Sequence, residues 1–236
     1  MRKVKYLNNK DLLKQIHISK NSFSSYTDDN YHRFDIILPS LEKINRLTIA
    51  EAKRNQADRI GKAAYEAARM AGDKKTKQAD VLPDWRKIEK TSLVFRIMTF
   101  EHIPLSPGRK RKTKTIADEH ERCNFPPFQH WRFDENDNLV CVGKSHWEGG
   151  MSNGSFNKGH GRVTEELGRM FLKLADRYGT RSNWRGYTYN DEMRAQAVLQ
   201  LSQIGLQFDE SKSENPFAYY TAAVTNSFTR VLNIEK

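Results

Sequence analysis

The chain has 236 residues with 40 Lys or Arg and 29 Asp or Glu, which gives a formal net charge of +11. No apolar run approaches the roughly 20 residues of a transmembrane helix, and the N-terminus lacks the apolar stretch of a secretory signal, so we expect neither a membrane span nor secretion. Two cysteines are too few to stabilise a chain of this length through disulfide bonds, and they indicate a reducing compartment. The basic excess favours nucleic acid or another acidic partner, although many mildly basic proteins bind no nucleic acid.

The charge is distributed unevenly along the chain. Residues 161–236 carry ten Lys or Arg against nine Asp or Glu, whereas residues 1–160 carry 30 against 20. We therefore predict three parts: an N-terminal helical segment (1–29), a basic α+β insert (30–158) and a helical domain (159–236). The predicted fold class is mostly α with a small antiparallel β insert.

The first part of the chain contains two helical patterns. One covers residues 9–20, with Asn9 as the expected N-cap. The other covers residues 48–71, where Thr48 is the expected N-cap and Gly72 the stop.

Strand patterns follow in the middle of the chain. Residues 92–103, 129–134 and 138–146 are rich in β-branched and aromatic residues, and residues 134–137 have the composition of a turn. These segments predict a small antiparallel sheet.

The last third has the pattern of three amphipathic helices. The first covers residues 161–178 and the second residues 189–204, with Thr188 and Asp191 as a cap pair. The third opens with Asn215 as N-cap and Pro216 at its first position, which is a strong start signal. Periodicity alone predicts a three-helix unit and no chemistry.

A series of short motifs in this third resembles a known family. They are Arg177-Tyr178, Gly186-Tyr187, Asp191-Glu192-Met193, Ile204-Gly205-Leu206, Phe208-Asp209 and Asn215-Pro216-Phe217-Ala218-Tyr219-Tyr220. In this order and spacing, residues 162–236 resemble region 2 of bacterial sigma factors, and within that class the late-transcription sigma factors of T-even-type phages. The early stretch Tyr6-Leu7-Asn8-Asn9-Lys10-Asp11-Leu12-Leu13 is also similar to the opening of those late sigma factors.

The resemblance implies a non-enzymatic specificity subunit without a cofactor, active in the cytoplasm of a bacterial host. It would bind the clamp helices of the largest subunit of core RNA polymerase and direct the enzyme to −10-type late promoters. The second helix would supply the polymerase contact through Glu192, Gln196, Leu199 and Gln200. The third helix would bind promoter DNA through Tyr219, Tyr220, Asn226, Thr229 and Arg230. Tyr220 also lies on the apolar stripe, so a core position is equally compatible with its spacing.

The chain departs from known sigma factors at two points, one relative to the primary and one relative to the late sigma factors. Where those proteins carry a pair of tryptophans that open the duplex, this chain has Ala223 and Val224, which implies slow promoter opening without help. The late sigma factors contact a phage sliding clamp through a tail beyond the third helix. Because the sequence stops in mid-helix at Lys236, we expect that such a tail is truncated here.

The middle segment leaves two further possibilities open. The basic run Arg109, Lys110, Arg111 and Lys112 is either a DNA-contacting patch or a solvated loop. His120, Cys123, Cys141 and His146 include two sulfur and two imidazole ligands for zinc, but their spacing is not that of a standard finger. The rival functions are accordingly a DNA-binding, metal-dependent nuclease and a transcription regulator that mimics a sigma factor.

Overall fold

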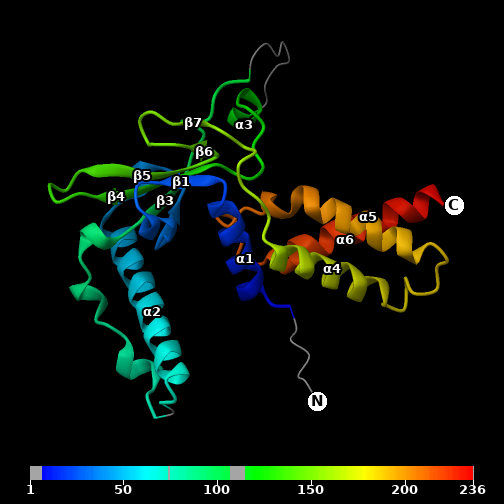
Figure 1. Cartoon of the computed structure of the whole chain (residues 1–236), viewed down its shortest axis with the longest axis horizontal. Coiled ribbons are helices and arrows are strands. Elements are labelled where there is room, and N and C mark those ends of the chain that lie inside the picture. Colours follow the sequence, from blue (N-terminus) through cyan, green and yellow to red (C-terminus); the bar gives the residue numbers. More distant parts are fainter. Residues whose placement is uncertain (1–6, 74, 107–114, 236) are drawn as a thin grey trace. The chain divides into compact units, whose positions relative to one another are not determined.

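The computed structural model describes residues 7–73, 75–106 and 115–235, and the chain divides into two compact units (Figure 1). The helical unit comprises residues 1–24, 122–126 and 157–236, and the sheet unit comprises residues 25–121 and 127–156. The N-terminal residues thus belong to the same unit as the C-terminal helices. In the part of the chain just defined, every helix is too short or too polar to cross a membrane.

The sheet unit is built on a five-stranded sheet in the order β1-β5-β4-β3-β2. The strands are β1 Ser24–Tyr26, β2 Ile36–Leu38, β3 Phe95–Met98, β4 Phe128–Phe133 and β5 Leu139–Ser145. Strand β3 pairs with β4 in antiparallel fashion, as does β4 with β5, but β2 runs parallel to β3. The prediction of an antiparallel sheet is therefore wrong: the sheet is mixed, because helix α2 connects β2 to β3 as a crossover.

The predicted hairpin is confirmed. The Asp134 carboxylate accepts hydrogen bonds from the backbone N–H groups of Asn136 and Asn138, and this closes the turn between β4 and β5. Asp137 has φ of 66°, a left-handed conformation that Asp tolerates in turns. The strand predicted over 92–103 is shorter, because β3 covers only Phe95–Met98.

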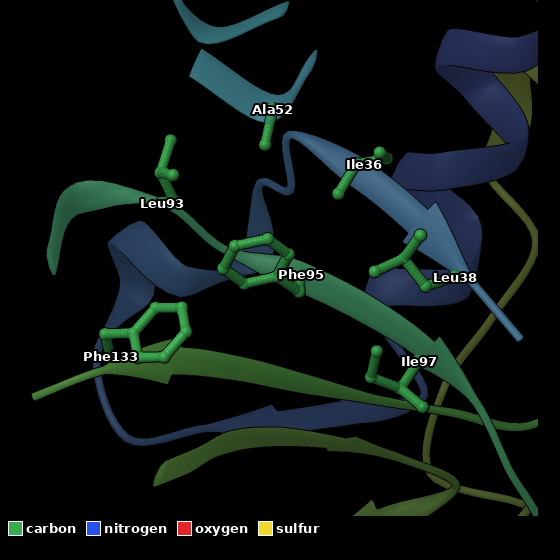
Figure 2. Close-up of a cluster of buried hydrophobic side chains, with 7 residues drawn as sticks. All are labelled: Ile36, Leu38, Ala52, Leu93, Phe95, Ile97 and Phe133. Atoms are coloured by element: carbon green, nitrogen blue, oxygen red, sulfur yellow. The ribbon is translucent and has the colours of Figure 1, made fainter. Parts of the chain in front are cut away.

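Helix α2 (Arg46–Met70) packs on this sheet and completes a hydrophobic core. Its N-cap is Asn45, not Thr48; the Thr48 hydroxyl accepts from the Asn45 N–H, so the two residues form a capping box. Figure 2 shows the buried side chains gathered between α2 and the strands. They are Ile36, Leu38, Ala52, Leu93, Phe95, Ile97 and Phe133.

Short elements complete the sheet unit. They are the α-helical turn α3 Ile116–Glu119, the β6 Trp147–Glu148 and β7 Ser155–Phe156 ribbon, and 3-10 turns at Asp29–His32, Leu41–Lys43, Gln78–Val81, Trp85–Lys87 and Lys90–Ser92. Strands β6 and β7 pair in antiparallel fashion, apart from the main sheet.

The helical unit contains α1 (Asn9–Asn21), α4 (Glu165–Gly179), α5 (Asn190–Ile204) and α6 (Pro216–Ile234), with a 3-10 turn at Gly205–Gln207 after α5. Helices α4, α5 and α6 pack side by side, as predicted from their apolar stripes (Figure 1). The start of α6 is confirmed, since Asn215 caps it and Pro216 is its first residue.

Two predicted caps in this unit are wrong. Asn8, not Asn9, accepts the capping hydrogen bond of α1, from the backbone N–H of Asp11. Helix α5 begins after Tyr189, whose side chain makes no capping hydrogen bond, and Asp191 instead pairs with Arg194. Helix α5 thus starts without the side-chain cap that Thr188 was expected to supply.

A buried lysine attaches α1 to the C-terminal part of the unit. The ammonium of Lys20 donates to the backbone carbonyl of Phe208 at 2.7 Å and pairs with Glu210 at 2.5 Å, and both side chains are almost fully buried. Asn9 accepts a hydrogen bond from the backbone N–H of Phe217 at the first turn of α6. These contacts fix α1 against the start of α6 and the segment that precedes it.

The junction of α5 and α6 depends on a glycine. A Cβ at Gly205 would lie 2.4 Å from the Phe171 ring, which is itself buried. The hydroxyl of Tyr220 donates to the Gly205 carbonyl at 2.6 Å, and the Tyr220 ring meets that of Phe171 edge-on. Gly205 is thus required for space and not for its backbone conformation, which is right-handed.

We predict that Gly205→Ala destabilises the protein by about 1–3 kcal/mol, because the new methyl group overlaps a ring that has no room to move. Gly186→Ala is the matched control, since its added Cβ would meet no atom within 4 Å apart from those of its own residue and its two chain neighbours. Urea unfolding followed by circular dichroism measures both. Equal stability of the two variants would contradict the close contact at Gly205.

Candidate functional site

A groove of about 380 Å³ runs between α5 and α6, and we call it the α5–α6 groove. Its lining comprises Gln196, Gln200, Ile204, Tyr219, Ala222, Ala223, Asn226, Ser227 and Arg230. Residues three or four apart share a face of a helix, which is why α6 presents its members of this set together and α5 presents Gln196, Gln200 and Ile204. Five of the predicted binding residues meet here: Gln196, Gln200, Tyr219, Asn226 and Arg230.

Small residues leave the space that forms the groove. Ala222 and Ala223 line it with methyl groups only, and Ala223 is half-buried there. Val224, the next residue, is fully buried in the core of the helical unit. Ala223 therefore lines the groove, whereas Val224 lies in the core.

Tyr219 offers an aromatic surface at one end of the groove. Its ring is half-buried and packs against the rings of Phe208 and Tyr220, with centroids 5.6 and 5.5 Å apart. Burial raises the pKa of the Tyr219 phenol, so the hydroxyl stays protonated at neutral pH and remains a hydrogen-bond donor. The two neighbouring rings hold Tyr219 in place.

Tyr220 lies in the core. Its side chain is fully buried, and its hydroxyl is used by the Gly205 carbonyl. Burial and the nearby Glu210 carboxylate raise the pKa of Tyr220 far above its usual value. The sequence spacing left Tyr220 open between a DNA-binding position and a core position. The structure places it in the core, so its ring presents no face to a base.

The other candidates on α5 and α6 lie outside the groove lining. Glu192 and Leu199 are exposed on α5, and Leu199 is 51% exposed, which is high for an apolar side chain. Thr229 is exposed on α6, where its hydroxyl donates to the backbone carbonyl of Thr225. The basic run Arg109, Lys110, Arg111 and Lys112 falls outside the described residues.

The candidate zinc ligands do not assemble within the described residues, where no three His, Cys, Asp or Glu side chains come together in a metal-binding arrangement. Cys141 lies in β5 with its thiol directed to the Gly143 carbonyl, and burial raises the pKa of that thiol. His146 is buried beside Ser145, and His120 contacts the Ile116 carbonyl. A raised thiol pKa opposes the thiolate form that binds zinc.

A second hollow, of about 630 Å³, adjoins the C-terminal end of α5 and shares Gln200 and Ile204 with the α5–α6 groove. It adds Arg122 and Lys158 to the polar residues of this region. Sequence patterns missed it because residues 122–126 lie far from α5 along the chain and carry no periodic signal.

In comparisons with known proteins, no family model, curated protein or solved structure matches the chain at a significant level. The assignment of the site therefore depends on the geometry of the groove and on the motifs of the helical third.

We predict that Tyr220→Leu destabilises the helical unit by about 2–4 kcal/mol, because it removes a buried ring and leaves the Gly205 carbonyl without its donor. Tyr219→Leu should cost less than about 1 kcal/mol, since its ring lies at the surface of the groove. Thermal and urea unfolding distinguish the two. A larger loss for Tyr219 than for Tyr220 would contradict the placement of these rings.

Proposed function

We propose that this chain acts as a sigma-type specificity subunit, which binds core RNA polymerase through α5 and −10-type promoter DNA through α6. The observation that carries the proposal is the α5–α6 groove, where glutamines from α5 and the aromatic, amide and guanidinium groups of α6 lie together. The family motifs of residues 162–236 supply the identity of the two partners.

The exposed face of α5 suits a docking surface for another helix. Glu192 and Leu199 are exposed, and Gln196 and Gln200 are half-buried at helical spacing beside them. An exposed leucine surrounded by polar groups is the arrangement of a small interface: the apolar side chain is buried on binding, and the polar rim sets the orientation. Clamp helices with complementary polar groups would fit this face.

The α6 side of the groove suits an unpaired strand of DNA. The Tyr219 ring can stack against a base, Asn226 can reach a base edge or a sugar, and Arg230 can bind a phosphate. Tyr219 and Arg230 are eleven residues apart, which corresponds to about 16 Å along the helix and so to several nucleotides. Ala223 and Val224 provide no aromatic wedge, so we propose that a closed duplex is opened slowly.

We predict that Glu192→Arg combined with Gln196→Glu abolishes co-elution with core RNA polymerase, because the substitutions reverse the charge pattern of the docking face. Size-exclusion chromatography of the mixture measures complex formation. Lys173→Glu is the matched control, a charge reversal at an exposed position of α4. Co-elution that survives the α5 substitutions would place the polymerase contact elsewhere.

We also predict that the protein with core polymerase binds a template with a pre-melted −10 bubble much more tightly than the closed duplex. Tyr219→Leu should weaken binding to the bubble by about 1–3 kcal/mol, the range for loss of one stacked base. Electrophoretic mobility shifts give both affinities. Tyr219→Phe, which keeps the ring, should bind as the unmodified protein does, and an equal loss for Phe and Leu would exclude stacking.

A further inference from the structure

A row of aromatic rings lies where α4 connects to α5, away from the residues that line the α5–α6 groove. It runs from Tyr178 through Trp184 and Tyr187 to Tyr189, and we call it the aromatic row. Successive ring centroids are 6.2, 6.2 and 5.3 Å apart. The sequence shows an aromatic and basic linker here, but the contact between the rings appears only in the structure.

The inner half of the row is anchored and the outer half faces solvent. Tyr178 and Trp184 are buried, and each packs edge-on against Phe228 of α6, with centroids 5.1 and 5.4 Å away. Tyr187 is 36% exposed, and Tyr189 is half-buried. Fixed inner rings therefore hold two outer rings at the surface, where part of each ring is exposed to solvent.

Positive charge lies at the inner end of the row and in the turn that follows it. The Arg181 guanidinium lies 4.3 Å from the centroid of Tyr178, and Arg185 is exposed in the same turn, where its backbone N–H bonds to the Arg181 carbonyl. Two nearby carboxylates, Asp176 and Asp191, both pair with the single guanidinium of Arg194, which offsets one of their two negative charges.

Glu235 is one further acid near the row. The pKa of the Tyr189 phenol is raised mainly by burial, and to a smaller extent by Tyr187 and by the Glu235 carboxylate. The hydroxyl of Tyr189 therefore stays protonated and neutral at physiological pH, and the ring adds no negative charge that would repel a phosphate.

We propose that the aromatic row is a binding site for single-stranded nucleic acid, with bases stacked on Tyr187 and Tyr189 and phosphates held by Arg181 and Arg185. Stacking requires unpaired bases, because the faces of paired bases are already covered by their neighbours in the duplex. Aromatic faces beside cations are the general solution for binding such strands without sequence preference. This site needs no RNA polymerase and does not use the α5–α6 groove, so it goes beyond the proposed function.

The test is fluorescence anisotropy of fluorescein-labelled oligo(dT) and oligo(U) with the full chain at low salt. Tyr187→Leu combined with Tyr189→Leu should weaken binding at least about tenfold, because loss of one stacked base corresponds to about 5- to 150-fold. Tyr187→Phe combined with Tyr189→Phe keeps both rings and should bind as the unmodified chain does. Similar affinity for oligo(dT) and oligo(U) is expected, since both offer bases and phosphates.

A matched control separates this site from other tyrosines of the chain. Tyr65→Leu removes a half-buried tyrosine of α2 to which no binding role is assigned. It should not reproduce the loss. If circular dichroism shows that the double leucine variant is unfolded, the Tyr187→Leu variant alone serves as the test, because that ring is the most exposed of the row. Unchanged affinity of a folded Tyr187→Leu variant, or equal affinity for duplex and single strand, would overturn the proposal.

Discussion

The close approach of α5 to α4 and α6 depends on the absence of a side chain at Gly205. The Phe171 ring occupies the space that a Cβ would take, and Tyr220 bonds to the carbonyl of the same residue. Both rings are buried, so a shift of either one would disturb the packing of the core. These two contacts at Gly205 join α4, α5 and α6, and they determine how closely the last turn of α5 lies to the first turns of α6.

Two surfaces follow from that packing. Tyr220 occupies the core side of α6, so Tyr219 is turned toward the groove, where Ala222 and Ala223 leave the space that Tyr219 borders. At the other end of α6, Phe228 supports Tyr178 and Trp184, and through them the exposed part of the aromatic row. The core of the helical unit thus positions aromatic rings at two separate points of its surface.

Local signals predicted the helical third well and the sheet less well. Asn215 and Pro216 mark the start of α6 because a cap and a fixed φ act within a few residues. Strand β2 was missed because it has three residues, too few for a period to appear. The N-cap of α2 was misplaced because Asn45 and Thr48 are both residue types that cap helices, so composition could not choose between them. Lys20 appears as an ordinary helix-surface lysine, yet it is buried against Glu210, 190 positions away. Periodicity left Tyr220 open between core and surface; packing around Gly205 decided it.

Run-off transcription with purified core RNA polymerase tests the central claim most directly. On linear templates with an AT-rich −10 element, the account predicts transcripts with a defined start only when this chain is added, and more of them when the −10 region is pre-melted. Transcripts that are absent from both kinds of template, or that decrease when the chain is added, would contradict it. A decrease would instead identify a regulator that occupies the polymerase without directing it to promoters.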